Sequence, residues 1–353
     1  MAGTLGVDVE TVRAIALSAA GTLVLFTTVS DALLTTVRAG RASGPMTQRL
    51  ADLLWQFALK LGSRRGPPPG TGPAITFAAV TLWVVLLVSG WFLVFSASPG
   101  AIVDSQDRPA DSWARLYFTA FTVSTLGIGD YRPSGAVFQV LTGVAAIMAF
   151  GLATLVITYV ASLNSAVASQ RRFARQVLGL GSSPVDILHA NWTGRDFGPL
   201  ANELQSLTGS VHGLVEEQLT YPLLHYFSTR QRNAAFWPAI ATLNEVILLL
   251  DNYVRHEYRP APLALHPLQR AIDGYLDVLP RARVDHPSSH PPQPDIHELR
   301  QVGIPVVLPI AMPSRAHLQR RNTIHAALES QGWKWEAAVY AAHPAAKDER
   351  TTA

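Results

Sequence analysis

The sequence contains no cysteine among its 353 residues. A chain without thiols forms no disulfides and offers no thiolate ligands for zinc or iron–sulfur clusters, and it has no cysteine nucleophile. Charge is also scarce, since only 15% of the residues are Asp, Glu, Lys or Arg, compared with about 25% in an ordinary soluble domain. The formal net charge of +3 is too small for this length to indicate binding to nucleic acid.

The few charges are unevenly distributed. Residues 1–170 hold 18 of the 53 charged side chains, and all eleven histidines lie from His189 onward. An apolar first half followed by a polar second half indicates a membrane protein with an attached aqueous domain.

Three segments are long and apolar enough to cross a bilayer, which requires about 20 largely uncharged residues. They run over residues 14–37, 75–97 and 135–170. The chain starts with MAGTLGVDVE, which is acidic and precedes a long apolar run. A cleaved signal peptide has a basic start and a short apolar region instead, so the first segment is expected to be a retained span.

The distribution of Lys and Arg predicts the orientation of these spans. The connection between the first two spans carries six basic residues against one acid, Asp52, and the third span is followed by Arg171, Arg172 and Arg175. By the positive-inside rule, this connection and the C-terminal half are cytoplasmic. The N-terminus and residues 98–134 are then outside, and the protein is expected to be a multi-pass protein of the plasma (inner) membrane.

The cytoplasmic connection contains an amphipathic pattern. Its apolar residues recur at helical spacing: Met46, Leu50, Leu53, Leu54, Phe57 and Leu61. The pattern fits a helix that lies on the inner leaflet, and it fits equally a helix that packs on the cytoplasmic domain. The sequence GPPPGTGP at 66–73 ends this helix and leads into the second span.

One carboxylate interrupts the first span. At mid-membrane, Asp31 would make insertion of the span less favourable by about 2.5–3.5 kcal/mol. Its side chain is therefore expected to face protein or water. Because Arg38 follows within about two helical turns, a place near the inner interface is favoured over a role in gating or in the ion pathway.

The segment between the second and third spans, residues 111–133, carries the chemistry. Asp111 or Ser112 is a good N-cap for a helix over 112–123. About three turns are too few to cross a bilayer, so this segment must enter the membrane and return to the same side. Non-helical backbone at membrane depth is tolerated only where it is buried in protein or lines a water-filled cavity.

The returning segment suits the binding of a dehydrated cation. Gly127 and Gly129, at alternate positions, permit backbone angles that other residues resist. A chain with such angles can turn successive carbonyls to one side, where they replace the water around a cation. The preceding short helix also directs the negative end of its dipole toward the membrane centre.

The sequence STLGIGD at 124–130 resembles the selectivity filter of potassium channels, which usually reads T-V-G-Y-G-D. The order of outer helix, pore helix, filter and inner helix over about 75–165 resembles their two-helix pore module. The resemblance implies four chains around one axis, with K⁺ as the permeant ion and no other cofactor. It implies that the filter ligands are Thr125, through its hydroxyl and carbonyl, and the carbonyls of Leu126, Gly127 and Ile128. Gly129 would close the filter at its outer end, while Ser124 and Asp130 would support it.

Two filter residues depart from the family pattern. Leu126 replaces the usual valine, and Ile128 replaces an aromatic residue that usually hydrogen-bonds the scaffold behind the filter. Because the ligands are backbone atoms, the cation sites tolerate these changes, whereas strict selectivity for K⁺ over Na⁺ is less secure. A weakly selective monovalent cation channel with the same pore is therefore the nearest competing interpretation.

Further features of the pore segment allow two interpretations each. Phe150-Gly151-Leu152 resembles the middle of the family's inner helices, and Gly143 and Gly151 are candidate hinges, although glycine also serves close helix packing in membranes. Three acids, Asp104, Asp107 and Asp111, form either an acidic outer vestibule or a solvated loop.

The cytoplasmic half is predicted to be mainly helical. Helices are expected near 200–214 and at 236–254, 262–279 and 315–330, with a proline-rich connector at 284–296 and an extended apolar stretch at 303–313. The segment 236–254 contains Glu245 and Asp251, which favour a buried soluble helix over a fourth span. The histidines lack the spacing of metal ligands and are expected on the surface.

No pattern of a voltage sensor, a Rossmann domain or a catalytic pair is present, so the chain is predicted not to be an enzyme. The sequence thus predicts an all-α membrane protein with a potassium-channel-like tetrameric pore in a lipid bilayer. Its predicted parts are an N-terminal helix (1–38), a cytoplasmic connection (39–73), a pore domain (74–170, inner helix 135–165) and a cytoplasmic regulatory domain (171–353). A transport subunit, or a membrane-anchored sensor with a vestigial pore, also fits the sequence, and no regulatory ligand is indicated.

Overall fold

The computed structural model describes residues 9–37, 43–62, 66–279, 290–294, 296–307 and 313–340. These residues form a mainly helical protein whose described part contains one two-stranded sheet. They divide into two compact units: the described residues within 1–38, 42–52 and 74–162, and those within 53–73 and 163–353. Most of the proline-rich connector, the middle of the stretch 303–313, and Arg38 lie outside the described residues.

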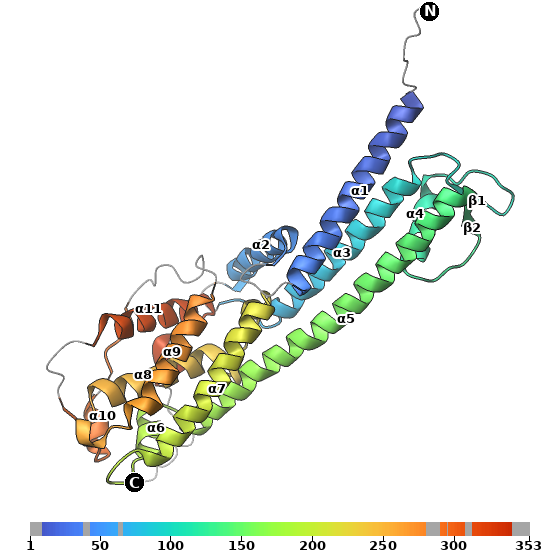
Figure 1. The fold of residues 1–353 in the computed structure, drawn as a ribbon. Coiled ribbons are helices and arrows are strands. Elements are labelled where there is room, and N and C mark those ends of the chain that lie inside the picture. The colour runs from blue at the N-terminus through green and yellow to red at the C-terminus, as the bar shows by residue number, and fades with distance from the viewer. Residues whose placement is uncertain are drawn as a thin grey trace, which may run out of the picture. The chain divides into compact units, whose positions relative to one another are not determined.

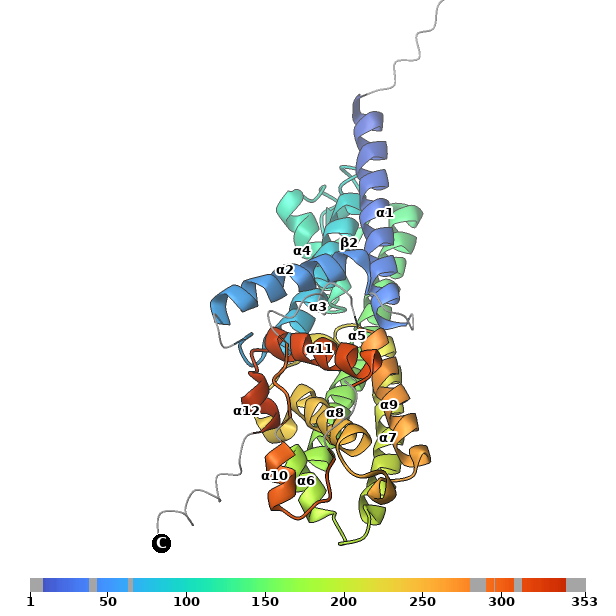
Figure 2. The ribbon, with the colours of Figure 1, turned by 90° about the vertical axis from the view of Figure 1, so that its left-hand side faces the viewer.

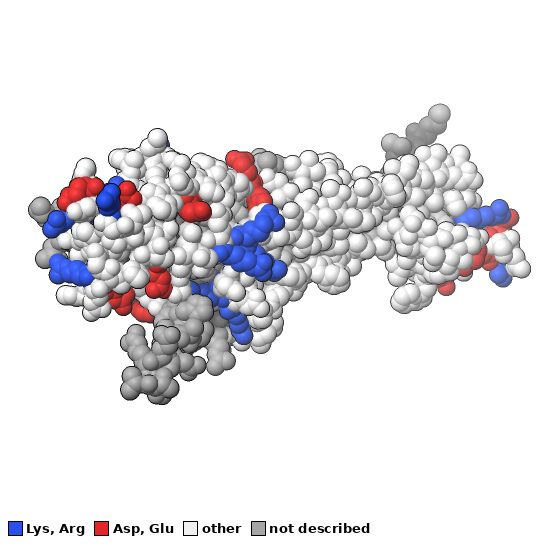
Figure 3. Space-filling view, turned by 90° about the horizontal axis from the view of Figure 1, so that it is seen from below, with Lys and Arg blue, Asp and Glu red and all other residues white. Residues whose placement is uncertain are grey.

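The first unit contains the three expected spans. They are helices α1 (Val9–Thr36), α3 (Thr71–Phe95) and α5 (Gly135–Gly179), and each is long and apolar enough to cross a membrane (Figure 1). The third helix continues beyond the bounds expected for the inner helix, to Gly179, and no proline interrupts it. Figure 3 shows the face of this part of the molecule as almost free of charged residues, except at the end that carries the loops before and after α4 (Ser112–Val123).

Helices α1 and α3 approach each other closely at two glycines. A Cβ atom on Gly21 would lie 2.7 Å from the carbonyl oxygen of Gly90, and one on Gly90 would lie 2.8 Å from the side chain of Leu25. Small residues at such a crossing let two helix backbones pack directly, which is the main source of helix association in membranes.

The buried carboxylate of Asp31 joins three helices. It is 1% exposed and accepts hydrogen bonds from the backbone N–H of Met46 (2.7 Å) and Thr47 (3.2 Å), in the first turn of α2 (Pro45–Gly62). It also accepts from the Thr47 hydroxyl and from the indole Nε1 of Trp83 on α3 (3.0 Å). The side chain therefore faces protein, as expected, and it caps α2 from another helix.

Replacing Asp31 with alanine is expected to loosen this junction and to lower the free energy of unfolding by about 2–3 kcal/mol, because buried donors lose a charged acceptor. Thermal unfolding of the full-length protein in detergent measures the effect. Asp52→Ala is the matched control, since Asp52 lies partly exposed on α2 and accepts a side-chain hydrogen bond from Gln48. Equal losses in both variants would show that Asp31 has no special structural role.

Helix α2 presents two different faces. Trp55 is 5% exposed and packs edge-on against Tyr226, with ring centroids 5.5 Å apart. Leu53, Phe57 and Leu61, four residues apart on another face, are each about two-thirds exposed. The Trp55 face thus packs on the C-terminal half of the chain, which was one of the two expected placements, and the apolar row is left uncovered.

The second unit is helical, as expected (Figure 2). Its helices are α6 (Pro184–Ala190), α7 (Gly198–Thr220), α8 (Phe236–Asn252), α9 (Pro262–Asp277), α10 (Ile296–Gln301), α11 (Arg315–Ser330) and α12 (Trp335–Val339), with 3₁₀ turns at Leu224–Tyr226, Arg232–Ala234 and His256–Tyr258. The apolar helix α8 is buried along nearly its whole length by α6, α9, α11 and α12. It therefore forms the core of this unit. The presence of Glu245 and Asp251 favoured such a buried soluble helix over a fourth membrane span.

The expectation that the histidines lie on the surface is wrong for two of them. His317 and His325 are 8% and 5% exposed. Both are on α11, whose low overall hydropathy conceals a buried face made of polar residues that find partners on neighbouring helices.

Candidate ion-conducting site

The short helix α4 has the bounds expected of a pore helix. The carboxylate of Asp111 caps its first turn by accepting a hydrogen bond from the backbone N–H of Ala114 (2.7 Å). Phe118 is 2% exposed, and its ring meets Phe95 of α3 edge-on at 5.3 Å and Phe121 at 5.2 Å. Aromatic packing against α3 therefore sets the position of α4 and of the backbone that leaves it.

The backbone after α4 turns back on the end of the helix. The N–H of Ser124 donates to the carbonyl of Ala120 (2.9 Å), that of Thr125 to Thr122 (3.1 Å), and that of Leu126 to Phe121 (2.9 Å). The C-terminal carbonyls of α4 are thus satisfied by the N–H groups of the predicted filter.

The predicted filter alternates in backbone handedness. Thr125, Gly127 and Gly129 have φ angles of 60°, 58° and 90°, whereas Leu126 and Ile128 between them do not have positive φ. A threonine in this region is uncommon because its Cβ crowds the backbone. A backbone with positive φ at alternate residues can turn successive carbonyl groups to one side.

The carbonyl groups of this segment remain available. Among the described residues, no hydrogen bond ends on the backbone oxygens of 125–129. Every residue from 124 to 130 is exposed in the single chain, including the apolar Leu126 (67%) and Ile128 (51%). A run of carbonyls without hydrogen-bond partners offers oxygen ligands to a cation.

A small sheet holds the outer end of the segment. Strand β1 (Ile102–Asp104) pairs antiparallel with β2 (Tyr131–Pro133), which starts directly after Asp130. Arg132 on β2 forms an ion pair with Asp107 (2.7 Å). The backbone that follows the predicted filter is thereby attached to the loop that follows α3.

The three outer acids all have structural contacts. Asp104 accepts hydrogen bonds from the backbone N–H groups of Arg108 and Gln106 (2.9 Å each) and pairs with the Arg108 side chain (2.8 Å). The hydrogen bond from the Arg108 backbone is the main reason that the pKa of Asp104 is lowered. Asp107 pairs with Arg132, and Asp111 caps α4. All three carboxylates therefore have structural contacts within the loop, for which the sequence allowed either an acidic vestibule or a solvated loop.

Two tyrosines missed by sequence reasoning lie at the outer end of the segment. The carboxylate of Asp130 accepts a hydrogen bond from the backbone N–H of Tyr131 (3.0 Å). The Tyr117 ring meets Phe121 edge-on at 5.2 Å and Tyr131 at 6.2 Å. Aromatic side chains therefore do stand beside the segment, but they come from α4 and β2, and the run YFTAF at 117–121 was the available signal.

The remaining predicted site residues lie outside this cluster. The Ser124 hydroxyl donates to the carbonyl of Phe121 (3.2 Å) and so belongs to the end of α4. On α5, an added Cβ at Gly143 or Gly151 would meet no described atom within 4 Å, and both glycines are exposed. Helix α5 is continuous through both glycines.

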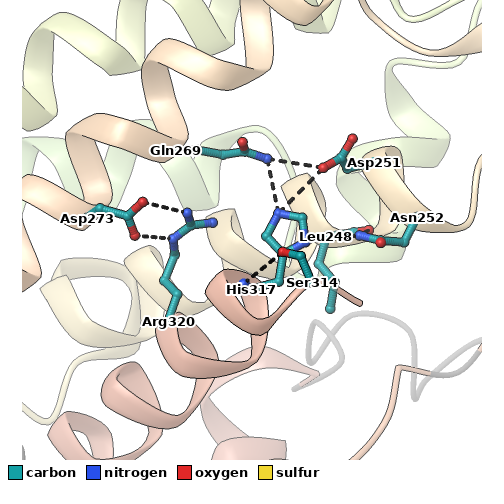
Figure 4. Close-up of polar contacts among 8 residues, drawn as sticks. All are labelled: Leu248, Asp251, Asn252, Gln269, Asp273, Ser314, His317 and Arg320. Atoms are coloured by element: carbon teal, nitrogen blue, oxygen red, sulfur yellow. Dashed lines mark hydrogen bonds and ion pairs between the residues drawn. The ribbon is translucent and has the colours of Figure 1, made fainter. Parts of the chain in front are cut away.

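The second unit contains a separate polar cluster (Figure 4). His317 Nε2 lies 3.5 Å from a carboxylate oxygen of Asp251, and Arg320 makes a bidentate ion pair with Asp273 (2.6 and 2.7 Å). Burial, together with the charge of Arg320, lowers the pKa of His317 against the opposing effect of Asp251. The described residues contain no group of three or more His, Asp or Glu side chains that could hold a metal ion.

A fully buried ion pair lies on the other face of α11. Glu245 of α8 is 0% exposed and pairs in a bidentate manner with Arg321 (2.6 and 2.9 Å). The Tyr340 hydroxyl donates to the same carboxylate (3.2 Å), and the Arg321 guanidinium lies 5.4 Å from the centre of the Trp335 ring. These contacts join α8, α11 and α12.

Comparison with known proteins identifies an ion channel domain and one full-length relative. Residues 81–166, which include α4, the segment 124–130 and much of α5, match the ion channel family. The chain is 30% identical over 322 residues to the uncharacterized membrane protein YdjJ of Bacillus subtilis (strain 168), and the match covers 90% of this chain and 94% of that protein. No solved structure matches the chain.

Proposed function

The chain belongs to the family of membrane proteins that includes YdjJ and carries an ion channel domain, and we propose that this domain is the pore of a potassium channel. One observation carries the proposal: the segment Thr125-Leu126-Gly127-Ile128-Gly129 combines alternating positive φ angles with carbonyls that have no hydrogen-bond partner among the described residues. Such carbonyls replace the hydration shell of K⁺.

In this proposal the ion is conducted passively. K⁺ enters from the outer side past Asp130, exchanges water for carbonyl oxygens, and is displaced inward by the next ion. The side chains of Leu126 and Ile128 act by packing behind the filter. The edge-on contact between the Tyr117 and Tyr131 rings supports the outer end, which in potassium channels is supported by an aromatic residue at the position of Ile128. In this proposal the chain conducts ions rather than catalysing a reaction, and K⁺ is the permeant ion.

The proposal requires four copies of the chain. One chain supplies one carbonyl strand, and a ring of such strands surrounds the ion. The exposed apolar residues on α5 support this arrangement, since Val137, Val140, Val144 and Ile147 recur at intervals of three and four and form a continuous row. Neighbouring chains and lipid cover these residues in the tetramer.

The proposed setting is the plasma membrane, with the N-terminus outside and residues 171–353 in the cytoplasm. The exposed row of Leu53, Phe57 and Leu61 on α2 then lies against the inner leaflet. Helix α5 continues without interruption from the pore segment into the second unit, and this continuity supports a role of the cytoplasmic domain in opening.

Measurement of the reversal potential tests the proposal. The purified protein in a planar bilayer, with equal concentrations of K⁺ on one side and Na⁺ on the other, is expected to reverse at least about 59 mV from zero, which corresponds to a tenfold permeability ratio for a monovalent ion. Bilayers without protein are the control. A reversal potential near zero with robust current would contradict K⁺ selectivity and would support the weakly selective cation channel. The argument for that alternative is that Ile128 stands where potassium channels usually have an aromatic residue.

A further inference from the structure

A cavity of about 470 Å³ is lined only by residues of the second unit. Its walls come from the residues at the start of α3, from the last part of α5, from the turn after Leu224–Tyr226, from the start of α8 and from the end of α11. Cavities of about 300–1,000 Å³ are typical of small-molecule sites.

The charge of the residues that line the cavity favours an anionic ligand. Among its lining residues, all of which are described, Arg171 is the one with a permanent charge, and none is Asp or Glu. Arg171 is exposed on α5. A guanidinium without a carboxylate nearby binds phosphate in a bidentate manner.

Flat aromatic rings form much of the wall. Phe227, Trp237 and Trp333 line the cavity from three separate segments. Aromatic side chains stack on planar rings, and all four types of nucleobase can stack in this way.

Two carboxamides line the cavity, and one of them has an oxygen without a hydrogen-bond partner. The side-chain oxygen of Gln331 is buried and has no hydrogen-bond partner among the described residues, while its nitrogen makes a long contact of 3.4 Å with the carbonyl of His225. Gln170 is 8% exposed, and its nitrogen lies 3.4 Å from the Tyr275 hydroxyl. Paired amide donors and acceptors are well suited to the edge of a nucleobase.

We propose that this cavity is a regulatory site for a nucleoside monophosphate. Arg171 holds the phosphate, Trp237 and Trp333 stack on the base, and the carboxamides of Gln170 and Gln331 contact its edge. The lining includes Gly70 directly before α3 and Asn164 to Arg171 on α5, so the ligand bridges the segments that lead into both helices of the pore module. The part of the proposal in which the ligand controls opening rests on the proposed channel function. The part in which the ligand binds in this cavity is independent of that function.

Binding is tested with the full-length protein in lipid nanodiscs, titrated separately with AMP, GMP, CMP and UMP while intrinsic tryptophan fluorescence and heat are recorded. At least one nucleotide is expected to bind saturably at one site per chain. Arg171→Gln is expected to weaken it at least about tenfold, as the loss of a charged hydrogen bond does. Arg175→Gln, an exposed arginine one turn further along α5 that does not line the cavity, is expected to change affinity less than about twofold.

Three results would overturn the proposal. The first is that none of the four nucleotides binds at concentrations up to about 10 mM. The second is that inorganic phosphate and ribose 5-phosphate bind as tightly as the nucleotides, because the base is then not recognised. The third is equal affinity in Arg171→Gln and Arg175→Gln. If Arg171→Gln unfolds, Gln331→Leu replaces it, since removing a buried unpartnered acceptor preserves folding and is expected to weaken binding at least about fivefold.

The same preparation separates this inference from the channel proposal. Nucleotide binding without potassium current in bilayers would overturn the proposed function and leave the site intact. A potassium-selective current without nucleotide binding would overturn the site and leave the channel intact.

Discussion

Replacement of Gly127 by alanine is expected to abolish potassium-selective conduction while the protein still folds. Gly127 has a φ of 58°, and an added Cβ would meet no described atom within 4 Å, so the effect comes from backbone conformation and not from a clash. Alanine in the left-handed region costs about 1–2 kcal/mol per residue, and four chains around one axis would add to about 4–8 kcal/mol. The carbonyl of residue 127 is then expected to rotate out of the ring.

The measurement is the bi-ionic reversal potential together with single-channel conductance. We expect the K⁺ to Na⁺ permeability ratio to fall to about one, or the conductance to fall at least tenfold, since about 1.4 kcal/mol already corresponds to a factor of ten. Gly209→Ala is the matched control because Gly209 lies on α7, away from the pore segment in sequence, and is helical, exposed and equally uncrowded. Its alanine variant is expected to be stabilised by about 0.5–1 kcal/mol and to conduct normally. Wild-type selectivity in Gly127→Ala would contradict the placement of the filter.

The architecture of the membrane unit was predictable because its signals are local. The length and low charge of the spans, the capping residue Asp111, and the short helical run before the glycines each act within a few turns of the chain. The bilayer and the caps leave few arrangements for such segments. The alternating φ angles at 125, 127 and 129 likewise follow from glycine at two of the three positions.

The contacts that join segments distant in sequence were not predictable. From the sequence alone, Asp31 is predicted only to make insertion of the first span into the membrane less favourable. Its partners Met46 and Trp83 are 15 and 52 residues away in the sequence. The contact between the Tyr117 and Tyr131 rings depends on how the chain turns after α4. The polar face of α11 was missed for the same reason, because its low hydropathy resembles a solvent-exposed helix until α8 and α9 supply its partners.

Replacement of Arg321 by methionine is expected to destabilise the second unit by about 3–5 kcal/mol, because it leaves the Glu245 carboxylate buried without its cation. Glu245 is 0% exposed, so water cannot replace the lost hydrogen bonds. Tyr340 retains its single hydrogen bond to Glu245, which is too little to compensate for two charged bonds. Guanidinium unfolding of the full-length protein, followed by tryptophan fluorescence, measures the change because Trp335 lies under the Arg321 guanidinium.

A second substitution distinguishes the cost of an unpaired charge from the value of the pair. The double variant Glu245→Leu with Arg321→Met removes both charges and fills the same space with apolar atoms, and such replacements of buried pairs are often neutral or stabilising by about 1–4 kcal/mol. We therefore expect it to recover most of the stability lost in the single variant, with a coupling of at least about 2 kcal/mol in the double-mutant cycle. Arg255→Met controls for the loss of an arginine as such, since Arg255 and Glu257 form an exposed pair 3.6 Å apart that contributes less than about 1 kcal/mol. A double variant as unstable as the single one would show that the pair itself, and not the avoidance of an unpaired charge, holds α8 and α11 together.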